Sequence, residues 1–203
     1  MERVIAYVDG NCLSFGLCSK GWQRFLWLDV RALAGHFLGP GQELVLTRYV
    51  AELVAGPEAE RRRQAVYLEA LRTRPDFRGS YVPYLSEDIP CRGCGREVPA
   101  HIEKMAPVEL AVDLLADAAL DRFDAALLFT ADGSLAGAVA TARRLGRHRP
   151  ITVVFPPGMR SVALEDVASG VLHVGNRELA KSLLPDFVER KDDSPLRRPE
   201  EWR

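Results

Sequence analysis

The chain has 203 residues, of which 47% are hydrophobic and 27% charged, and its formal net charge is -1 at pH 7. This composition supports one sizeable core and excludes a globally basic surface of the kind that binds nucleic acid through net charge alone. No stretch reaches the roughly 18 consecutive apolar residues of a membrane helix, and the first residues lack a signal-peptide pattern, so we expect a cytoplasmic protein with no membrane partner.

Strand and helix signals alternate along the chain. Residues 3–8 and 43–50 are predicted to be strands, and a helix over 29–38 lies between them with Asp29 as its cap. The elements predicted next are, in order, a polar helix over 57–74, an edge strand over 80–85, a helix over 103–120, a strand over 124–130, a helix over 134–145, a strand over 151–155, a short helix near 161–168, a strand over 171–174 and a helix over 176–183. Strands separated by helices of this length predict the α/β class, with a doubly wound, mainly parallel sheet in a three-layer α/β/α sandwich.

The predicted elements form one domain over residues 1–184. The last residues, 185–203, are charged and contain several prolines. We expect them to be a mobile tail or an arm that binds a partner.

Two aspartates follow predicted strands: Asp9 in "AYVDGN" and Asp132 in "LLFTADGS". Ligands of parallel sheets collect at the carboxyl ends of the strands, and two carboxylates held side by side there favour a cation. Capping of the helix that begins near Ser134 explains Asp132 equally simply. Glu109 and Asp113 lie one helical turn apart and supply further carboxylates, although an exposed acidic helix face would look the same.

Arginines gather in two stretches that could contact phosphates or could be solvated helix faces. The first stretch is Arg61, Arg62 and Arg63, and the second is Arg143, Arg144, Arg147 and Arg149. Motifs for other chemistry are missing from the sequence: it has no G-x-G-x-x-G, no G-x-x-x-x-G-K-[ST] and no G-x-S-x-G.

Cys91 and Cys94 form a C-x-x-C pair followed by glycine, a tight turn that allows two thiolates to reach one tetrahedral zinc. A full site needs four ligands. The others would have to be His101, a distant residue such as His36 or His173, or a partner chain. A structural zinc site, two free thiols and a redox pair all remain open as interpretations.

Three stretches in order, "VDGNCL", "EKMAPVELAVDLL" and "FTADGSLAG", resemble the V-D-G-x-N, E-K-x-x-D-V and S-x-D-S-D-L motifs of the NYN domain proteins, which belong to the PIN-like nuclease superfamily. The resemblance covers about residues 3–175. It implies a PIN-like fold and an endoribonuclease activity. In such an enzyme, Mg²⁺ or Mn²⁺ activates a water molecule that hydrolyses a phosphodiester bond of RNA. The residues that the resemblance implies as catalytic metal ligands are Asp9, Asp113 and Asp132. Glu109, two residues after Pro107, is a further candidate ligand as a partial substitute for the family aspartate that Pro107 replaces.

The sequence departs from the family pattern at Cys12, Pro107 and Ser134, which stand where the family has Asn, Asp and Asp. A lost carboxylate weakens a divalent-ion site because fewer anionic oxygens offset the dehydration of the ion. The competing hypothesis is therefore a catalytically degenerate NYN domain that binds RNA or a protein. The oligomeric state is left open, and a homo-oligomer fits the sequence.

Overall fold

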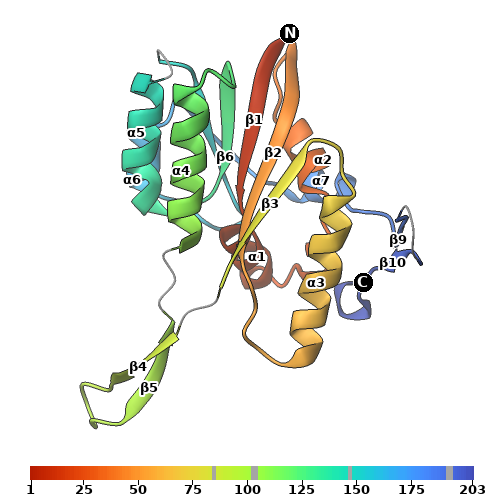
Figure 1. Ribbon diagram of the computed structural model, residues 1–203, viewed down its shortest axis with the longest axis vertical. Helices are drawn as coiled ribbons and strands as arrows, with labels where there is room; N and C mark the ends of the chain where they lie inside the picture. The colour runs from red at the N-terminus through yellow and green to blue at the C-terminus, as the bar shows by residue number, and fades with distance from the viewer. Residues whose placement is uncertain (84–85, 102–104, 146–147, 191–193) are drawn as a thin grey trace.

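The computed structural model describes residues 1–83, 86–101, 105–145, 148–190 and 194–203. Its centre is a six-stranded sheet in which every neighbouring pair is parallel, in the order β3-β2-β1-β6-β7-β8 (Figure 1). The strands are β1 (Glu2–Asp9), β2 (Gln42–Glu52), β3 (Phe77–Val82), β6 (Ala125–Phe129), β7 (Ile151–Phe155) and β8 (Gly170–His173). This confirms the predicted doubly wound α/β class, and β3 is an edge strand as expected.

Helices cover both faces of this sheet and complete the three layers (Figure 1). One face carries α1 (Gly10–Ser19), α2 (Val30–Gly35), α3 (Glu58–Arg72) and α7 (Asn176–Lys181). The other face carries α4 (Met105–Ala119), α5 (Ala136–Leu145) and α6 (Val162–Glu165). The short 3-10 turn η1 (Gln23–Phe25) lies between α1 and α2, and a second one, η2 (Gly133–Leu135), leads directly into α5.

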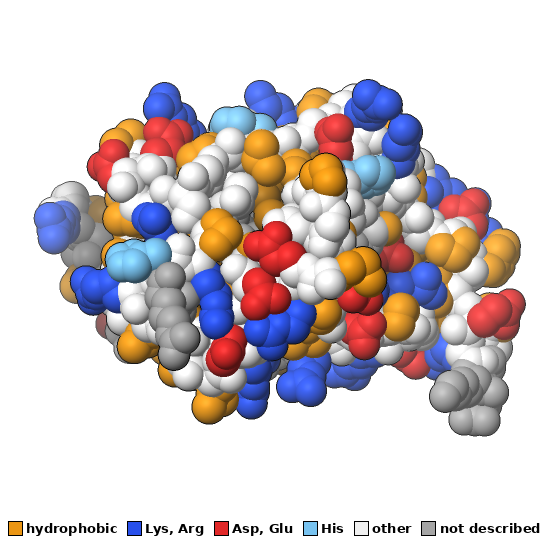
Figure 2. All heavy atoms as spheres, turned by 90° about the horizontal axis from the view of Figure 1, so that it is seen from above, with side chains coloured by type: hydrophobic (Ala, Val, Ile, Leu, Met, Phe, Trp, Pro, Cys, Tyr) orange, Lys and Arg blue, Asp and Glu red, His pale blue; other side chains and the backbone are white. Residues whose placement is uncertain are grey.

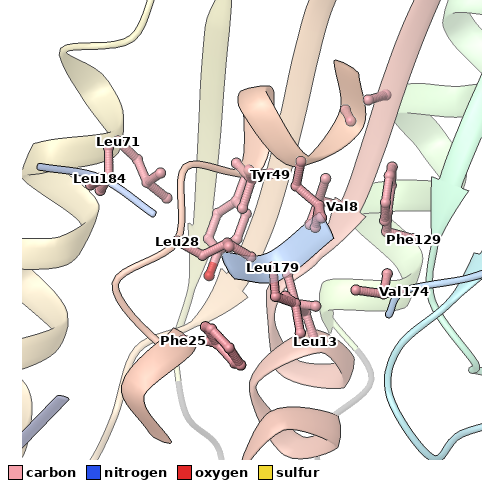
Figure 3. Packing of buried hydrophobic residues seen from close by; sticks show 14 of the residues in the cluster. Val8, Leu13, Phe25, Leu28, Tyr49, Leu71, Phe129, Val174, Leu179 and Leu184 are labelled. Atoms are coloured by element: carbon pink, nitrogen blue, oxygen red, sulfur yellow. The ribbon is translucent and has the colours of Figure 1, made fainter. Parts of the chain in front are cut away.

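The core is divided by the sheet because side chains of a strand alternate between its faces. Val8 of β1 packs with Leu13 of α1 and Leu179 of α7 on one face, and Figure 3 shows these side chains converging around Tyr49. Tyr7, the neighbour of Val8, lies in the other cluster with α4 and α5.

Helix α1 was not predicted, because residues 10–19 contain two glycines and two cysteines and no clear polar face. Its start is nevertheless well defined: Asp9 is extended and its side chain caps the helix. Gly10 is needed there, since a Cβ at this position would collide with the ring of Tyr49. Glycine at this position therefore lets α1 begin directly at the end of β1.

The segment around the cysteine pair is an antiparallel hairpin of β4 (Ser86–Pro90) and β5 (Glu97–His101), where the sequence indicated a loop. It extends away from the body of the molecule (Figure 1).

The C-terminal segment also differs from the expected mobile tail. It contains β9 (Phe187–Val188), β10 (Leu196–Arg197) and η3 (Glu200–Trp202), and Val188 is buried in the core. The ring of Trp202 lies 6.5 Å from that of Trp27 and 5.9 Å from that of Tyr67, centroid to centroid. The described part of this segment is therefore docked on the α1/α3 side of the sheet.

Among the described residues, no helix combines the length and the apolar character needed to cross a membrane.

Candidate functional site

The chain adds β2 and β3 on one side of β1, and it adds β6, β7 and β8 on the other. The strand order therefore reverses between β1 and β6. In open parallel sheets, ligands bind at the carboxyl ends of the strands on either side of such a point. Asp9 ends β1, and Thr130 and Asp132 follow β6, which pairs with β1. The two aspartates that the sequence singled out therefore lie on neighbouring loops at this edge.

Asp9 is buried, with 2% of its surface exposed, and both of its oxygens accept hydrogen bonds. Oδ1 accepts the backbone N–H of Cys12 at 2.9 Å, and Oδ2 accepts the Thr130 hydroxyl at 2.9 Å. Burial raises the pKa of Asp9 because it disfavours the charged form; these hydrogen bonds oppose the effect, and the charge of Asp132 adds to it. The site thus holds an acid in a place where ionisation is costly unless a cation is near.

Asp132 is half-buried and caps η2, since its Oδ1 accepts the backbone N–H of Ser134 at 2.9 Å. Asp132 therefore has the capping role that the sequence offered as an explanation for it. Its other oxygen, Oδ2, accepts no hydrogen bond from any residue that the structure describes. Thr130 links the two loops: its hydroxyl donates to Asp9 and accepts the backbone N–H of Asp132 at 3.1 Å.

Thr130 and Asn11 were both missed at the sequence level. The amide oxygen of Asn11 accepts the backbone N–H of Glu52 at 3.0 Å and so ties the start of α1 to the end of β2. The sequence held a signal for each of them: Thr130 directly follows an apolar strand, and Asn11 directly follows the Asp-Gly pair.

The Cys12 thiol lies 3.6 Å from the Thr130 hydroxyl. Burial raises the pKa of Cys12 to about 12, and the charge of Asp9 acts in the same direction. Cys12 is therefore a protonated thiol at neutral pH, which argues against a role as a nucleophile.

The structure does not bring Asp113 and Glu109 into this group. Asp113 forms an ion pair with Arg48 of β2, with Oδ1 2.8 Å from Nη1, and Glu109 accepts the hydroxyl of Ser80 in β3 at 2.9 Å. Burial raises the pKa of Asp113, and the charge of Arg48 works against that increase. Both α4 carboxylates face the sheet because α4 lies across it, and within the described part of the chain no three His, Cys, Asp or Glu residues lie close enough to share a metal ion.

Arg48 also holds Asp117, a fully buried carboxylate one turn further along α4. Its Nε and Nη2 donate to the two oxygens of Asp117 at 2.7 and 2.9 Å. Asp117 also accepts the hydroxyl of Tyr7 at 2.8 Å and Nη1 of Arg122 at 3.0 Å. Burial alone would raise the pKa of Asp117, but these hydrogen bonds outweigh it and lower the pKa. The network anchors α4 to β1 and β2.

A cavity of about 390 Å³ opens beside the first turn of α1. Its walls include Asn11, Ser14 and Gln64, and the amide of Gln64 bonds the backbone of Glu52 and Val54. A second cavity of about 300 Å³ shares these walls and continues to Gly10, Tyr49, Arg63 and Trp202. The hollow therefore extends from the residue next to Asp9 to the docked C-terminus.

The two arginine stretches lie at opposite edges of the sheet. Arg61, Arg62 and Arg63 lie in the first turns of α3, which begins just after the end of β2, on the side of Asp9 (Figure 1). Arg62 pairs with Glu58 and Arg63 with Glu201.

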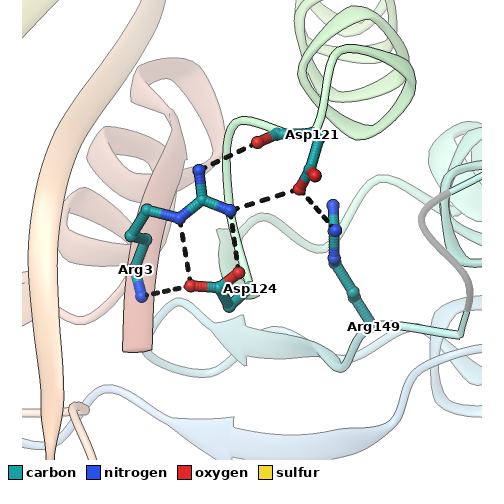
Figure 4. A network of polar contacts seen from close by, with 4 residues as sticks. All are labelled: Arg3, Asp121, Asp124 and Arg149. Atoms are coloured by element: carbon teal, nitrogen blue, oxygen red, sulfur yellow. Dashed lines mark hydrogen bonds and ion pairs between the residues drawn. The ribbon is translucent and has the colours of Figure 1, made fainter. Parts of the chain in front are cut away.

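Arg143 and Arg144 instead end α5, about 15 Å along that helix from η2, so they belong to the edge where the strands begin. Seen from that edge, basic side chains alternate with acidic ones (Figure 2). Arg149 there is paired with Asp121, which also binds Arg3 (Figure 4). The structure therefore does not bring Arg143 and Arg144 to the edge of the sheet that carries Asp9, and their contact with nucleic acid stays a prediction.

The cysteine pair occupies the turn between β4 and β5. The backbone N–H of Cys91 donates to the carbonyl of Arg96, and that of Gly95 donates to the carbonyl of Cys91, both at 2.8 Å. Gly95 has φ +70°, a conformation that glycine adopts readily. Hydrogen bonds from the backbone N–H groups of Gly93 and Cys94 and from the Cys94 side chain lower the pKa of Cys91.

His101 pairs with Ser86 at the end of the hairpin opposite the cysteines. Its backbone lies about 14 Å along β5 from Glu97, at a rise of about 3.4 Å per residue. The side chain of His101 lies outside the described part of the structure, but the register separates this residue from the pair. His36 follows α2 and His173 ends β8, so both belong to the body.

No protein-family model and no curated protein matches the chain. Its fold is similar to that in the crystal structure of a protein of unknown function from Vibrio parahaemolyticus, with a TM-score of 0.56. The alignment covers 90% of this chain and 96% of that one, and 17% of the aligned residues are identical. This likeness bears on the fold alone.

Proposed function

We propose that the chain is a ribonuclease that uses Mg²⁺ or Mn²⁺, as its resemblance to the NYN domain proteins implies. The observation that carries the proposal is the pair of carboxylates, Asp9 and Asp132, on the two loops that leave the point where the strand order reverses. Ligand sites in open α/β sheets gather at this point. The resemblance, together with this position, favours a phosphodiester substrate.

The donor set fits a hard divalent cation. Mg²⁺ is commonly held by one or two carboxylates, and waters and substrate phosphates complete its coordination. An ionised carboxylate oxygen has about two lone pairs, and each Asp9 oxygen accepts a hydrogen bond from a described residue. Together with Oδ2 of Asp132, this leaves oxygen donors for a metal, and the described residues beside them add only the protonated thiol of Cys12.

The protein residues orient the donors and bind the substrate. The Cys12 N–H and the Thr130 hydroxyl fix the Asp9 carboxylate, and the Ser134 N–H fixes that of Asp132. A metal held there would supply an activated water and neutralise charge on the phosphodiester. The hollow beside α1, with Arg63 in its wall, offers room for the neighbouring part of an RNA strand.

A second candidate function is a degenerate NYN domain that binds RNA without cutting it. The ion pair between Asp113 and Arg48 favours this candidate, because it commits the third carboxylate implied by the resemblance to the fold. With one carboxylate fewer, metal affinity is expected to be weak.

The test compares wild type with Asp132→Asn and Asp113→Asn, two matched changes that each remove one partly exposed charge. Mn²⁺ at 100 times its Kd should stabilise wild type by about 2.7 kcal/mol, or roughly 5–11 °C in Tm for a domain of this size. We expect the Mn²⁺-dependent rise in Tm to vanish in Asp132→Asn and to persist in Asp113→Asn. Cleavage of a generic single-stranded RNA in Mn²⁺ should follow the same pattern.

Asp9→Asn adds a control for folding. Because burial raises the pKa of Asp9, its ionised form is disfavoured by the fold at pH 7, and asparagine keeps the cap while removing the charge. The metal-free variant should therefore melt no lower than wild type while losing both the Mn²⁺ response and cleavage. A Mn²⁺-dependent rise in Tm that survives in both Asp9→Asn and Asp132→Asn would exclude this metal site. A rise in Tm of wild type that is accompanied by no cleavage would favour the degenerate NYN domain that binds RNA without cutting it.

A further inference from the structure

The β4/β5 hairpin carries Cys91 and Cys94 at the end that points away from the body (Figure 1). Its turn is closed by backbone hydrogen bonds on both sides of the pair, and the N–H groups of Gly93 and Cys94 point to the Cys91 sulfur. This turn presents two sulfurs from one short segment, which is half of a tetrahedral Zn²⁺ site. Both cysteines are free, and Cys94 is exposed.

The rest of the chain does not complete the site within the described residues. The register holds His101 at the far end of the hairpin, and His36 and His173 belong to the body. No described group of three or more His, Cys, Asp or Glu residues is placed to hold a metal. The described residues thus supply two of the four ligands, and a second molecule can supply the other two.

We propose that the hairpin turns of two copies of this chain meet and that Cys91 and Cys94 of both bind one Zn²⁺. A two-fold contact is isologous, so each copy contributes the same two thiolates and the site reaches four ligands. Because the hairpin projects from the body, the turns can meet without contact between the two sheets.

Two features of the hairpin fit a second copy as its partner. Ile89 and Val98 are directly paired in register and remain 45% and 43% exposed, so they form an apolar spot that a symmetric contact would cover. Four thiolates around one Zn²⁺ carry net negative charge, and each copy brings the exposed Arg92 and Arg96 next to that charge. This inference does not depend on the proposed ribonuclease activity.

The experiment measures bound zinc per chain and molar mass for the full chain purified with a reducing agent and Zn²⁺. We expect one zinc per two chains and the mass of two chains by light scattering. Removal of zinc with EDTA should return the mass of one chain. Cys91→Ser and Cys94→Ser should each lose both the zinc and the dimer, whereas Cys18→Ser, which alters an exposed cysteine of α1, should change neither.

His101→Ala separates the proposal from an intramolecular site and should keep the dimer with its zinc. One zinc bound by a single chain would overturn the second copy as the source of ligands. A zinc-free protein with reduced thiols, or a dimer that survives both EDTA and Cys91→Ser, would overturn the bridge itself.

Discussion

Replacement of Arg48 by methionine tests the assignment of Asp113 and Asp117 to the fold. Arg48 supplies two of the four hydrogen bonds to the fully buried Asp117 and the ion pair to Asp113. Methionine keeps most of the side-chain length but leaves Asp117 buried with only Tyr7 and Arg122 as partners. Removing one member of a buried pair costs about 3–5 kcal/mol, and the two surviving hydrogen bonds place the expected loss near 3 kcal/mol. For a chain of 203 residues this corresponds to a decrease in Tm of about 6–12 °C.

The pH dependence of this loss has a defined sign. The folded protein lowers the pKa of Asp117, so this carboxylate contributes stability above its unfolded pKa of about 3.9 and loses that contribution as pH falls through the folded value. Without Arg48, burial would dominate and the pKa of Asp117 would rise. The stability difference between wild type and Arg48→Met should therefore be largest near neutral pH. It should shrink as pH falls through the raised pKa of the variant and then through the lowered pKa of wild type.

Urea unfolding followed by circular dichroism at pH 7, 5 and 3.5 measures this difference. Arg122→Met is the matched control, since Arg122 donates to the same carboxylate from a side chain that is 49% exposed. It should cost less than about 1 kcal/mol. A loss below about 1 kcal/mol in Arg48→Met at pH 7, or an equal loss at pH 7 and 3.5, would refute the assignment and return Asp113 to the list of metal ligands.

Two further predictions concern the C-terminus and the turn after β6. Trp202→Ala removes two ring contacts worth about 0.5–1.5 kcal/mol each, so it should lower the unfolding free energy by roughly 1–3 kcal/mol in urea denaturation; an unchanged midpoint would mean that the segment does not dock in solution. Ser134→Asp adds a carboxylate beside Asp132, so calorimetry should find tighter Mn²⁺ binding together with a slightly lower Tm without metal. A higher metal-free Tm with unchanged Mn²⁺ affinity would show that Asp132 acts only as a cap.

The sheet could be predicted because its signals are local. Six short apolar runs separated by helical stretches define the strands, and parallel winding follows from the spacing. Helix α1 could not be predicted from periodicity, since tertiary packing of Leu13 and Leu17 and the cap at Asp9 outweigh its two glycines. The β4/β5 hairpin was missed because its short strands, "SEDIP" and "EVPAH", carry little hydrophobic pattern.

The site was only partly predictable because its contacts join distant parts of the sequence. The Asp9 and Asp132 positions follow from strand ends alone, whereas the pairing of Arg48 with Asp117 spans 69 residues. One signal was available: an arginine inside the apolar strand "ELVLTRYV" must find a buried carboxylate, since an unpaired buried charge is too costly. That requirement predicts that one acidic residue of α4 pairs with Arg48 and has a structural role.

In the proposed ribonuclease, the loss of Asp113 to Arg48 has a consequence for how metal and RNA bind. A cation held by Asp9 and Asp132 alone keeps more coordination positions for water and phosphate than one held by three carboxylates. The cation therefore binds the RNA-free protein more weakly. Its affinity increases more when a phosphodiester in the neighbouring hollow completes its coordination. Because binding free energies are reciprocal, RNA must then raise the affinity for Mn²⁺ by the same factor by which Mn²⁺ raises the affinity for RNA. A two-carboxylate site at this edge thus couples metal loading to the substrate, and the Thr130 hydroxyl, which joins both loops, is the contact that holds the two donors in one place.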